Sequence, residues 1–324
     1  MNIEDIINHV TAEPGLLLTQ LCRFGVPLMS FDERMQERLR RWYLQGQCSP
    51  GEKVVSELVN KRLMREFIQA RNIPLPRLFF IGRTLNTFDF NCIDRDFVVK
   101  PDNSADSDCV LLFRNGKELF SGQTVPKEQA MEFCLKKFSA GRFVNEATNF
   151  LVEEFVQDRD PSLVVPRDFK VYAAGGHAWL VQVINRNGPK ETWTSQFLFR
   201  DMENIRDPIQ TTYSRAGRRN IGVERDVFSE LVKHAERVSE EIPYLLRLDF
   251  YVGKSGPVFG EFTTYPFAGK RYTAVGDRML SQLMEIFPDD VSGQTDIHHA
   301  DLFDANRFTA WRRRLCGIRR SLGV

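Results

Sequence analysis

Two carboxylates on strands that are expected to pair are the clearest candidates for chemistry in this chain of 324 residues. Asp249 lies in the alternating segment 246–252 and Glu261 in the segment 258–264, with a short turn between them. Because side chains alternate across a strand, the pattern predicts that Asp249 and Glu261 lie side by side. Paired carboxylates repel unless positive charge lies between them, and Mg²⁺ suits such an oxygen-rich pair. The alternative is a solvated polar face of a hairpin.

Two lysines occupy positions from which a cation can reach a phosphate group. Lys100 ends the apolar strand predicted over 97–99, so we expect it at the mouth of a cleft; the alternative is a strand-end lysine in solvent. Lys170 shares one strand face with Asp168, which indicates either a cation aimed at phosphate or a surface ion pair.

A third lysine lies on the helix predicted over 51–72. Lys61 and Arg65 are four residues apart, so they share a face of that helix. Like charges at this spacing are unfavourable unless an anion lies between them. The pattern therefore predicts either an anion at this place or compensation by Glu57, one turn earlier.

The apolar strand predicted over 151–156 is interrupted by Glu153 and Glu154. One interpretation is a hinge between two lobes. The backbone of this hinge would hydrogen-bond to the edge of an adenine, and Glu153 would accept a hydrogen bond from the exocyclic amine. The other is an edge strand with two solvated carboxylates. The residues alone leave both open.

The elements that must position these side chains alternate between helices and antiparallel hairpins. Helices are expected as two or three short segments within 1–48, over 51–72, 126–140 and 224–241, and from about 279 onward. Strands are expected over 78–81, 97–99 and 151–156, with hairpins over 168–185, turning at Gly175-Gly176, and over 245–264. This mixed order predicts an α+β architecture, and the chain has neither G-x-G-x-x-G nor a Walker-type phosphate loop.

Composition is typical of a soluble globular protein, with 42% apolar and 27% charged residues and a net charge of +1. No global field favours nucleic acid as a partner. No apolar run is long enough for a membrane span, and the acidic start lacks the pattern of a signal peptide. Six scattered cysteines are typical of reduced thiols rather than of a zinc site, so we expect a cytoplasmic protein.

The order of these motifs resembles the ATP-grasp superfamily and, within it, the teichuronopeptide-biosynthesis (TupA-like) type. The stretches that carry the resemblance are NKRLMREFI at 60–68, FVVKPDN at 97–103, LVEEFV at 151–156, RDFKVYAAGG at 167–176 and LRLDFYVGKSGPVFGEFTTYPFAG at 246–269. They span most of the chain, and the last of them is the most specific.

The resemblance implies a role for each candidate residue. The positions implied to bind ATP are Lys61, Lys100, Glu153, Glu154, Phe155, Val156 and Asp168, where the lysines hold phosphates and the 153–156 segment holds adenine. The positions implied to act on the transferring phosphate and the acyl phosphate are Lys170, Arg186 and Arg247. The positions implied to bind Mg²⁺ are Asp249, Glu261 and Thr263, the last standing where many ATP-grasp enzymes carry Asn.

The resemblance also implies the organisation of the chain. The expected architecture is an ATP-grasp fold, in which two α/β lobes would clasp ATP after a helical lead-in. The implied units are a helical segment over 1–50, an N-terminal lobe over 51–157, a C-terminal lobe over 158–290 and a basic helical tail over 291–324. The tail carries WRRRLCGIRR at 311–320, which predicts either weak contact with the inner face of a membrane or a solvated terminal helix.

The implied reaction is ATP-dependent ligation of a carboxylate to an amine through an acyl phosphate, in the synthesis of a cell-surface polysaccharide or a peptide-like product. The implied partners are small-molecule or glycan carboxylates and amines. One departure from the family pattern is the loop 102–108, which lacks the usual glycines and carries three Asp. Two alternatives therefore stay open: a phosphotransferase acting on a hydroxyl, and a nucleotide-binding module without turnover.

Overall fold

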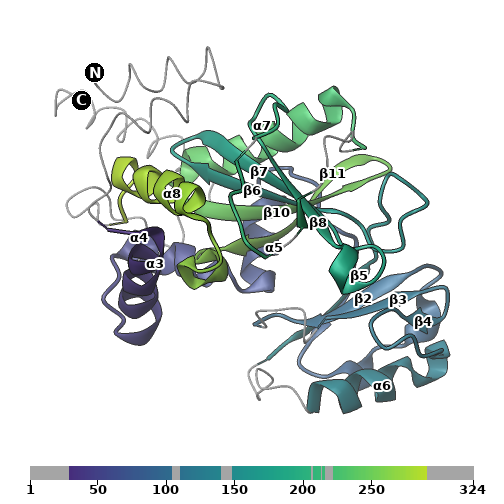
Figure 1. Cartoon of the computed structure of the whole chain (residues 1–324). Helices are drawn as coiled ribbons and strands as arrows, with labels where there is room; N and C mark the ends of the chain where they lie inside the picture. The colour runs from purple at the N-terminus through teal and green to yellow at the C-terminus, as the bar shows by residue number, and fades with distance from the viewer. Residues whose placement is uncertain are drawn as a thin grey trace.

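The computed structural model describes residues 29–103, 110–139, 148–205, 207–212, 214–215 and 222–289. These residues form two sheets, one with the strand order β1-β5-β2-β3-β4 and one with the order β11-β10-β6-β7-β8-β9. Neighbouring strands are antiparallel except for the short parallel pair β8–β9. Figure 1 shows the smaller sheet with α6 at one end of the molecule and the larger sheet with α7 at the other. The predicted α+β class is confirmed.

The smaller sheet has one apolar and one charged face. Its strands are β1 Leu78–Gly82, β2 Phe97–Pro101, β3 Leu111–Arg114, β4 Lys117–Glu118 and β5 Phe150–Glu154. Helix α6, Lys127–Ser139, contributes Ala130, Cys134 and Phe138 to the core over the apolar face. Phe97 and Val99 of β2 join that core, and strand alternation therefore places Lys100 on the opposite face.

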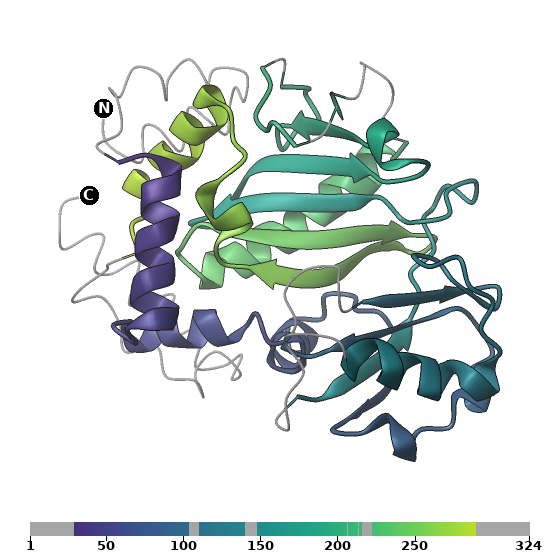
Figure 2. The ribbon, with the colours of Figure 1, turned by 60° about the horizontal axis from the view of Figure 1, so that its bottom comes forward.

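The larger sheet is covered on one face by α7, Arg225–Glu241. Its strands are β6 Asp168–Ala174, β7 His177–Asn185, β8 Thr194–Leu198, β9 Ser214–Arg215, β10 Leu246–Gly253 and β11 Gly256–Thr263. Val171 and Leu248 pack against Phe228 of α7 in the main core. The alternate residues of β6 and β10 lie on the other face, which is turned toward the viewer in Figure 2 with α7 behind the sheet.

Both predicted hairpins are present. The first turns at Gly175-Gly176, where both glycines have left-handed backbone angles. In the second, Asp249 stands directly opposite Glu261, which confirms that the two carboxylates are neighbours. The register then shifts by one residue, so Gly260 is an extra residue in β11. A side chain on Gly260 would lie 3.2 Å from the Asp249 carbonyl oxygen, so glycine suits this bulge.

The single helix predicted over 51–72 is wrong. Two helices occupy this stretch, α4 Pro50–Glu57 and α5 Lys61–Gln69. The break occurs because Asn60 adopts an extended conformation and its side chain accepts hydrogen bonds from the first turn of α5. Lys61 therefore stands at the beginning of a helix, and its backbone N–H donates to the Asp102 carbonyl at 2.8 Å.

The remaining helices are α3 and a π-helix near the start of the described chain, α8 near its end, and four short 3₁₀ turns. Their bounds are α3 Phe31–Leu39, the π-helix Arg40–Leu44, α8 Ala274–Ile286, and the 3₁₀ turns Leu85–Thr87, Phe90–Cys92, Lys190–Thr192 and Pro266–Gly269. Helix α8 begins before the predicted position near 279. Most of the helical lead-in predicted over 1–48, and the basic tail, lie outside the described residues.

Helices α4 and α5 precede the smaller sheet in the chain but share the core of the larger one. Val54, Leu58 and Phe67 pack in the same cluster as β6 and β10. In Figure 1 α5 lies between the two sheets. The domain limits implied by the resemblance stay a prediction. Within the described residues, no helix has the length and apolar character that a membrane span requires.

Candidate nucleotide and metal site

On the smaller sheet, Glu153 of β5 is the centre of a cation-rich cluster. Its two oxygens lie 2.6 Å from Lys100 Nζ and 2.6 Å from Arg65 Nη1, and its side chain is 2% exposed. Lys100 and Glu153 share the charged face because Val98 pairs with Glu153 in the β2–β5 register. The anion that the Lys61–Arg65 spacing requires is thus supplied by the protein itself.

Lys61 lies where the charges of both sheets meet. Its side chain is buried, and burial lowers its pKa to about 8. Glu261 of the larger sheet opposes this shift, while the nearby charge of Lys100 on the smaller sheet adds to it. These interactions show that Lys61, Lys100 and Glu261 belong to one electrostatic neighbourhood, although they come from α5, β2 and β11.

On the larger sheet, Asp249 is held between two cations. Arg247 donates from Nε at 2.7 Å and from Nη2 at 2.8 Å, and Lys170 of β6 donates from the other side. Burial by itself raises the pKa of the Asp249 carboxyl, but the charges of Arg247 and Lys170 outweigh it and lower the pKa well below its usual range. Asp249 is therefore ionised, and its charge is largely compensated within the protein.

The same face continues the alternation of charge. Lys170 Nζ lies 3.6 Å from Asp168 Oδ2, and Asp168 in turn pairs with Arg186. Lys170 and Arg186, both predicted to face phosphate, are thus tied to Asp168 and Asp249 in this structure. A nucleotide phosphate that binds Lys170 or Arg186 must therefore displace a carboxylate from that side chain.

Asp249 and Glu261 are the neighbouring carboxylates of this face that could hold Mg²⁺ together with phosphates. Glu261 is 46% exposed and lies 3.9 Å from Arg247 Nη2, so its oxygens are accessible. Thr263 stands opposite Arg247 in the register. Among the described residues no group of three or more His, Cys, Asp or Glu side chains is arranged to hold a metal. Two protein carboxylates are nevertheless the number that Mg²⁺ commonly takes beside substrate phosphates.

In the segment predicted to hold adenine, two backbone N–H groups are already hydrogen-bonded within the protein. The Glu154 N–H donates to the Arg77 carbonyl at 2.8 Å and the Phe155 N–H to the Asp96 carbonyl at 3.1 Å. Glu154 pairs with Arg95 at 2.9 Å at the surface. Within the described part of the chain, the Val156 N–H has no hydrogen-bond partner. Of these three N–H groups, that of Val156 is the one that could donate to a ligand.

Asp102 has a structural role that the sequence did not indicate. It is buried, and its two oxygens accept hydrogen bonds from the backbone and side-chain nitrogens of Asn149 at 3.0 and 2.8 Å. Its carbonyl also anchors the first turn of α5. Asp102 therefore ties β2 to α5, and residues 104–108 of the loop lie outside the described residues.

Sequence reasoning also missed a neutral polar network beside the charged row. Gln182 of β7, directly opposite Lys170, donates to Gln210 at 2.7 Å. The Tyr172 hydroxyl lies 3.0 Å from that of Tyr272. The position of Gln182 on a predicted hairpin strand was the only signal available, since Gln210 and Tyr272 come from distant loops.

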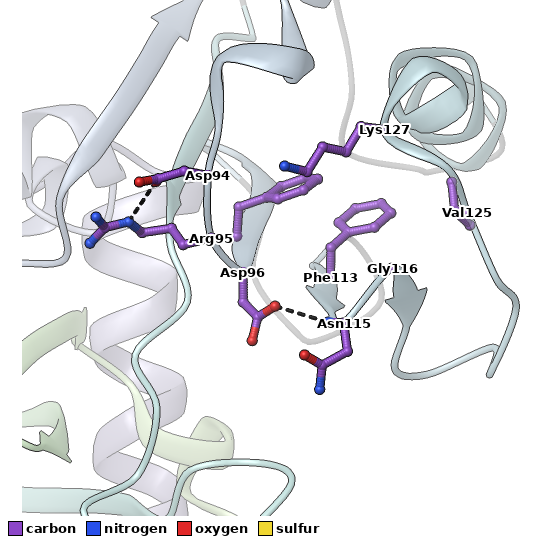
Figure 3. Close-up of a pocket in the computed structure, with 9 residues that line it drawn as sticks. Asp94, Arg95, Asp96, Phe113, Asn115, Gly116, Val125 and Lys127 are labelled. Atoms are coloured by element: carbon purple, nitrogen blue, oxygen red, sulfur yellow. Dashed lines mark hydrogen bonds and ion pairs between the residues drawn. The ribbon is translucent and has the colours of Figure 1, made fainter.

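A small pocket of about 170 Å³ lies in the smaller lobe, around the stacked rings of Phe97 and Phe113. Figure 3 shows Asp96 bonded to the Asn115 backbone and Asp94 paired with Arg95 at its rim. None of the residues implied to bind ATP or Mg²⁺ lines this pocket. It is separate from the candidate site.

Comparisons with known proteins agree with this architecture. The model of the family described as TupA-like ATPgrasp matches residues 33–284. No curated protein matches the chain.

Solved structures similar to the chain are ATP-grasp ligases. A D-alanine–D-alanine ligase from Helicobacter pylori is 15% identical with a TM-score of 0.42, over 72% of this chain and 59% of that one. A D-alanine–D-alanine ligase from Bacillus anthracis, complexed with ATP, is 11% identical with a TM-score of 0.43, over 73% and 69%. The ligase PsnB with a minimal precursor is 12% identical with a TM-score of 0.37, over 71% and 61%. The chain thus spans about 60% of the length of the first and third of these.

Proposed function

The chain belongs to the TupA-like ATP-grasp family, and from this premise we propose that it is an ATP-dependent ligase that joins a carboxylate to an amine through an acyl phosphate. The observation that carries the proposal is the meeting of two charged faces at Lys61. Lys100 of the smaller sheet and Arg65 of α5 form a surplus of cations around Glu153, and the larger sheet contributes the carboxylates Asp249 and Glu261.

The proposed reaction begins with the binding of ATP between the two sheets. Lys61 and Lys100 would hold the phosphates, because a triphosphate offers Lys100 more negative charge than its present partner Glu153. The Val156 N–H would bind the adenine edge. Moving a phosphoryl group requires positioning and charge neutralisation more than covalent help from the protein.

Asp249 and Glu261 would hold Mg²⁺ with the phosphates. Bound there, Mg²⁺ would neutralise charge on the phosphate oxygens and orient them. Arg247 and Lys170 would then be released in part from Asp249 and would face the substrate carboxylate and the acyl phosphate. A carboxylate oxygen of the substrate would attack the γ-phosphorus of ATP, and ADP would leave with the electrons of the broken P–O bond. The amine would then attack the acyl carbon of the acyl phosphate. A carbon–nitrogen bond would form, the acyl C–O bond would break, inorganic phosphate would leave with its electrons, and the amine nitrogen would lose a proton to solvent.

The proposal is tested by product analysis with the purified full chain. Mg-ATP is incubated with panels of carboxylates and amines, ADP release is measured, and products are identified by mass. An amide that appears only when both substrates are present supports ligation. A stable phosphate ester on a hydroxyl would support the phosphotransferase alternative, and the absence of ADP over the whole panel would support a nucleotide-binding module.

The site assignment is tested with Lys100→Ala. Removing this cation should abolish ATP turnover, or lower it by at least about a hundredfold, because a charge-assisted contact to phosphate is lost in a partly buried site. Lys254→Ala removes an exposed lysine from the turn between β10 and β11 and serves as the matched control. Normal turnover in Lys100→Ala would refute the assignment.

A further inference from the structure

A groove of about 790 Å³ opens between α5 and the segment that leads into β1. One wall is formed by Arg62, Arg65, Glu66 and Gln69 of α5, and the other by residues 72–78 and Ile81. None of the residues implied to bind ATP or Mg²⁺ lines it. Its volume lies within the range of about 300–1,000 Å³ that is typical of small-molecule sites.

The lining of the groove is basic. It contains three arginines, Arg62, Arg65 and Arg77, and a single acid, Glu66. Arg77 is exposed and has no ion-pair partner among the residues that the structure describes. Arg62 pairs with Glu66 at 2.7 Å, but both side chains are about half exposed, and such a pair exchanges readily for a ligand anion.

The floor of the groove is apolar. Ile73 and Pro76 are buried, and Leu75, Leu78 and Ile81 are half-buried. Guanidinium groups above such a floor suit a ligand that carries carboxylates or phosphates, because their planar fork binds these groups through two parallel hydrogen bonds.

Arg65 connects the groove to the nucleotide site. Its Nη2 donates to the Pro76 carbonyl at 2.9 Å, and its Nη1 donates to Glu153 at 2.6 Å. Glu153 is the same carboxylate that lies 2.6 Å from Lys100. One guanidinium therefore lines the groove while it shares a buried carboxylate with a lysine of the candidate ATP site.

We propose that this groove binds an anion with two or more carboxylate or phosphate groups, and that Arg65 couples the groove to the nucleotide site. A bound anion competes with Glu153 for Arg65. Glu153 then holds Lys100 more strongly, so the anion weakens ATP binding, and ATP weakens anion binding by the same factor. The groove lies outside the proposed catalytic site, and its direct test requires no turnover.

The groove is tested by calorimetric titration of the full chain with citrate, triglutamate and inorganic tripolyphosphate at constant ionic strength. Arg77→Ala should weaken binding by about tenfold, the contribution of one charge-assisted hydrogen bond. Arg83→Ala removes an exposed charge from the same lobe outside the groove lining, and it should change binding by less than about twofold. Binding of the carboxylates alone or of tripolyphosphate alone identifies the source of the anion. Equal losses in both variants, or no binding of any probe, would overturn the site.

The coupling is tested by measuring ATP affinity with and without the probe that binds. The probe should weaken ATP binding in the unmodified chain and have a smaller effect in Arg77→Ala. An equal effect in both proteins would show that the anion competes directly in the nucleotide site, which contradicts the coupling. If the chain does not bind ATP at all, the proposed function fails, but the direct titration still shows whether the groove binds an anion.

Discussion

The two charged faces that meet at Lys61 differ in how their charges are balanced. On the larger sheet, Lys170 and Arg247 enclose Asp249, and carboxylates and cations alternate along the row. At the smaller sheet, Lys100 of β2 and Arg65 of α5 share the single carboxylate Glu153. One face is internally neutralised and the other carries surplus positive charge.

This difference separates two tasks that a phosphoryl-transfer site must perform. Surplus cations attract and hold a polyanion, and here two cations share one carboxylate, so positive charge remains for a ligand. A neutralised row is preorganised, but removing any member leaves a buried partner uncompensated. Substitutions in the buried row around Asp249 should therefore affect folding, whereas those of the cations around Glu153 should affect ATP affinity.

The largest effect is expected for Asp249→Asn. The amide leaves the buried cations Lys170 and Arg247 without their carboxylate, so the free energy of unfolding should fall by about 3–5 kcal/mol. Urea denaturation of the variant and the unmodified chain measures this loss. Unchanged stability would mean that the row is not electrostatically preorganised, and the contrast between the two faces would disappear.

Glu261→Gln changes the carboxylate that stands opposite Asp249 on the neighbouring strand. Glu261 is 46% exposed, so the free energy of unfolding should change by less than about 0.5 kcal/mol. ATP turnover should nevertheless fall by at least about a hundredfold, because a carboxylate of the proposed Mg²⁺ site is lost. Turnover measured across Mg²⁺ concentrations checks this, and normal activity would remove Glu261 from the site.

The sequence was sufficient for the parts of the site that depend on strand alternation. The opposition of Asp249 and Glu261 follows from two short strands and a turn, and Lys100 lies on the charged face because Phe97 and Val99 fill the apolar one. Side-chain partners were less predictable. Nothing in the local pattern indicates that Arg65 reaches Glu153, because this contact joins residues 88 positions apart.

The break in the helix predicted over 51–72 has a different cause. Apolar spacing continues through Leu58 and Val59, and it therefore favours one continuous helix. In the structure, Asn60 starts a new helix as its N-cap residue. In the sequence, the capping signal of this one residue is weaker than the apolar pattern around it. Local capping chemistry thus fixed where Lys61 stands.

A smaller effect is expected from the titration of Lys61. Burial lowers its pKa from the ordinary value of 10.5 to about 8, so the free protein loses this charge as the pH rises through about 8. ATP binding should weaken over that range, and Lys61→Arg should flatten the pH profile because arginine stays charged. Affinities measured from about pH 7 to 9.5 at constant ionic strength test this. An identical pH dependence in the arginine variant would assign the titration to another group.

The same shift has a consequence for stability. Between about pH 8 and 10.5 the unfolded chain binds more protons at Lys61 than the folded chain does, so the free energy of unfolding should rise with pH over this window. Lys61→Met removes this contribution. The difference in stability between the unmodified chain and Lys61→Met should therefore change with pH above about 8 and be constant below it.

The smallest effect is expected for Asn60→Ala. The side chain of Asn60 accepts hydrogen bonds from the backbone N–H groups of Arg62 and Leu63 at 3.0 and 3.3 Å, and losing this cap should cost about 1 kcal/mol of unfolding free energy. The first turn of α5 carries Lys61, so ATP affinity should fall by a few-fold as that turn loosens. Asn60→Asp keeps a capping oxygen and should restore both properties. If the alanine variant loses stability but binds ATP normally, the Asp102 carbonyl alone is sufficient to hold Lys61 in place.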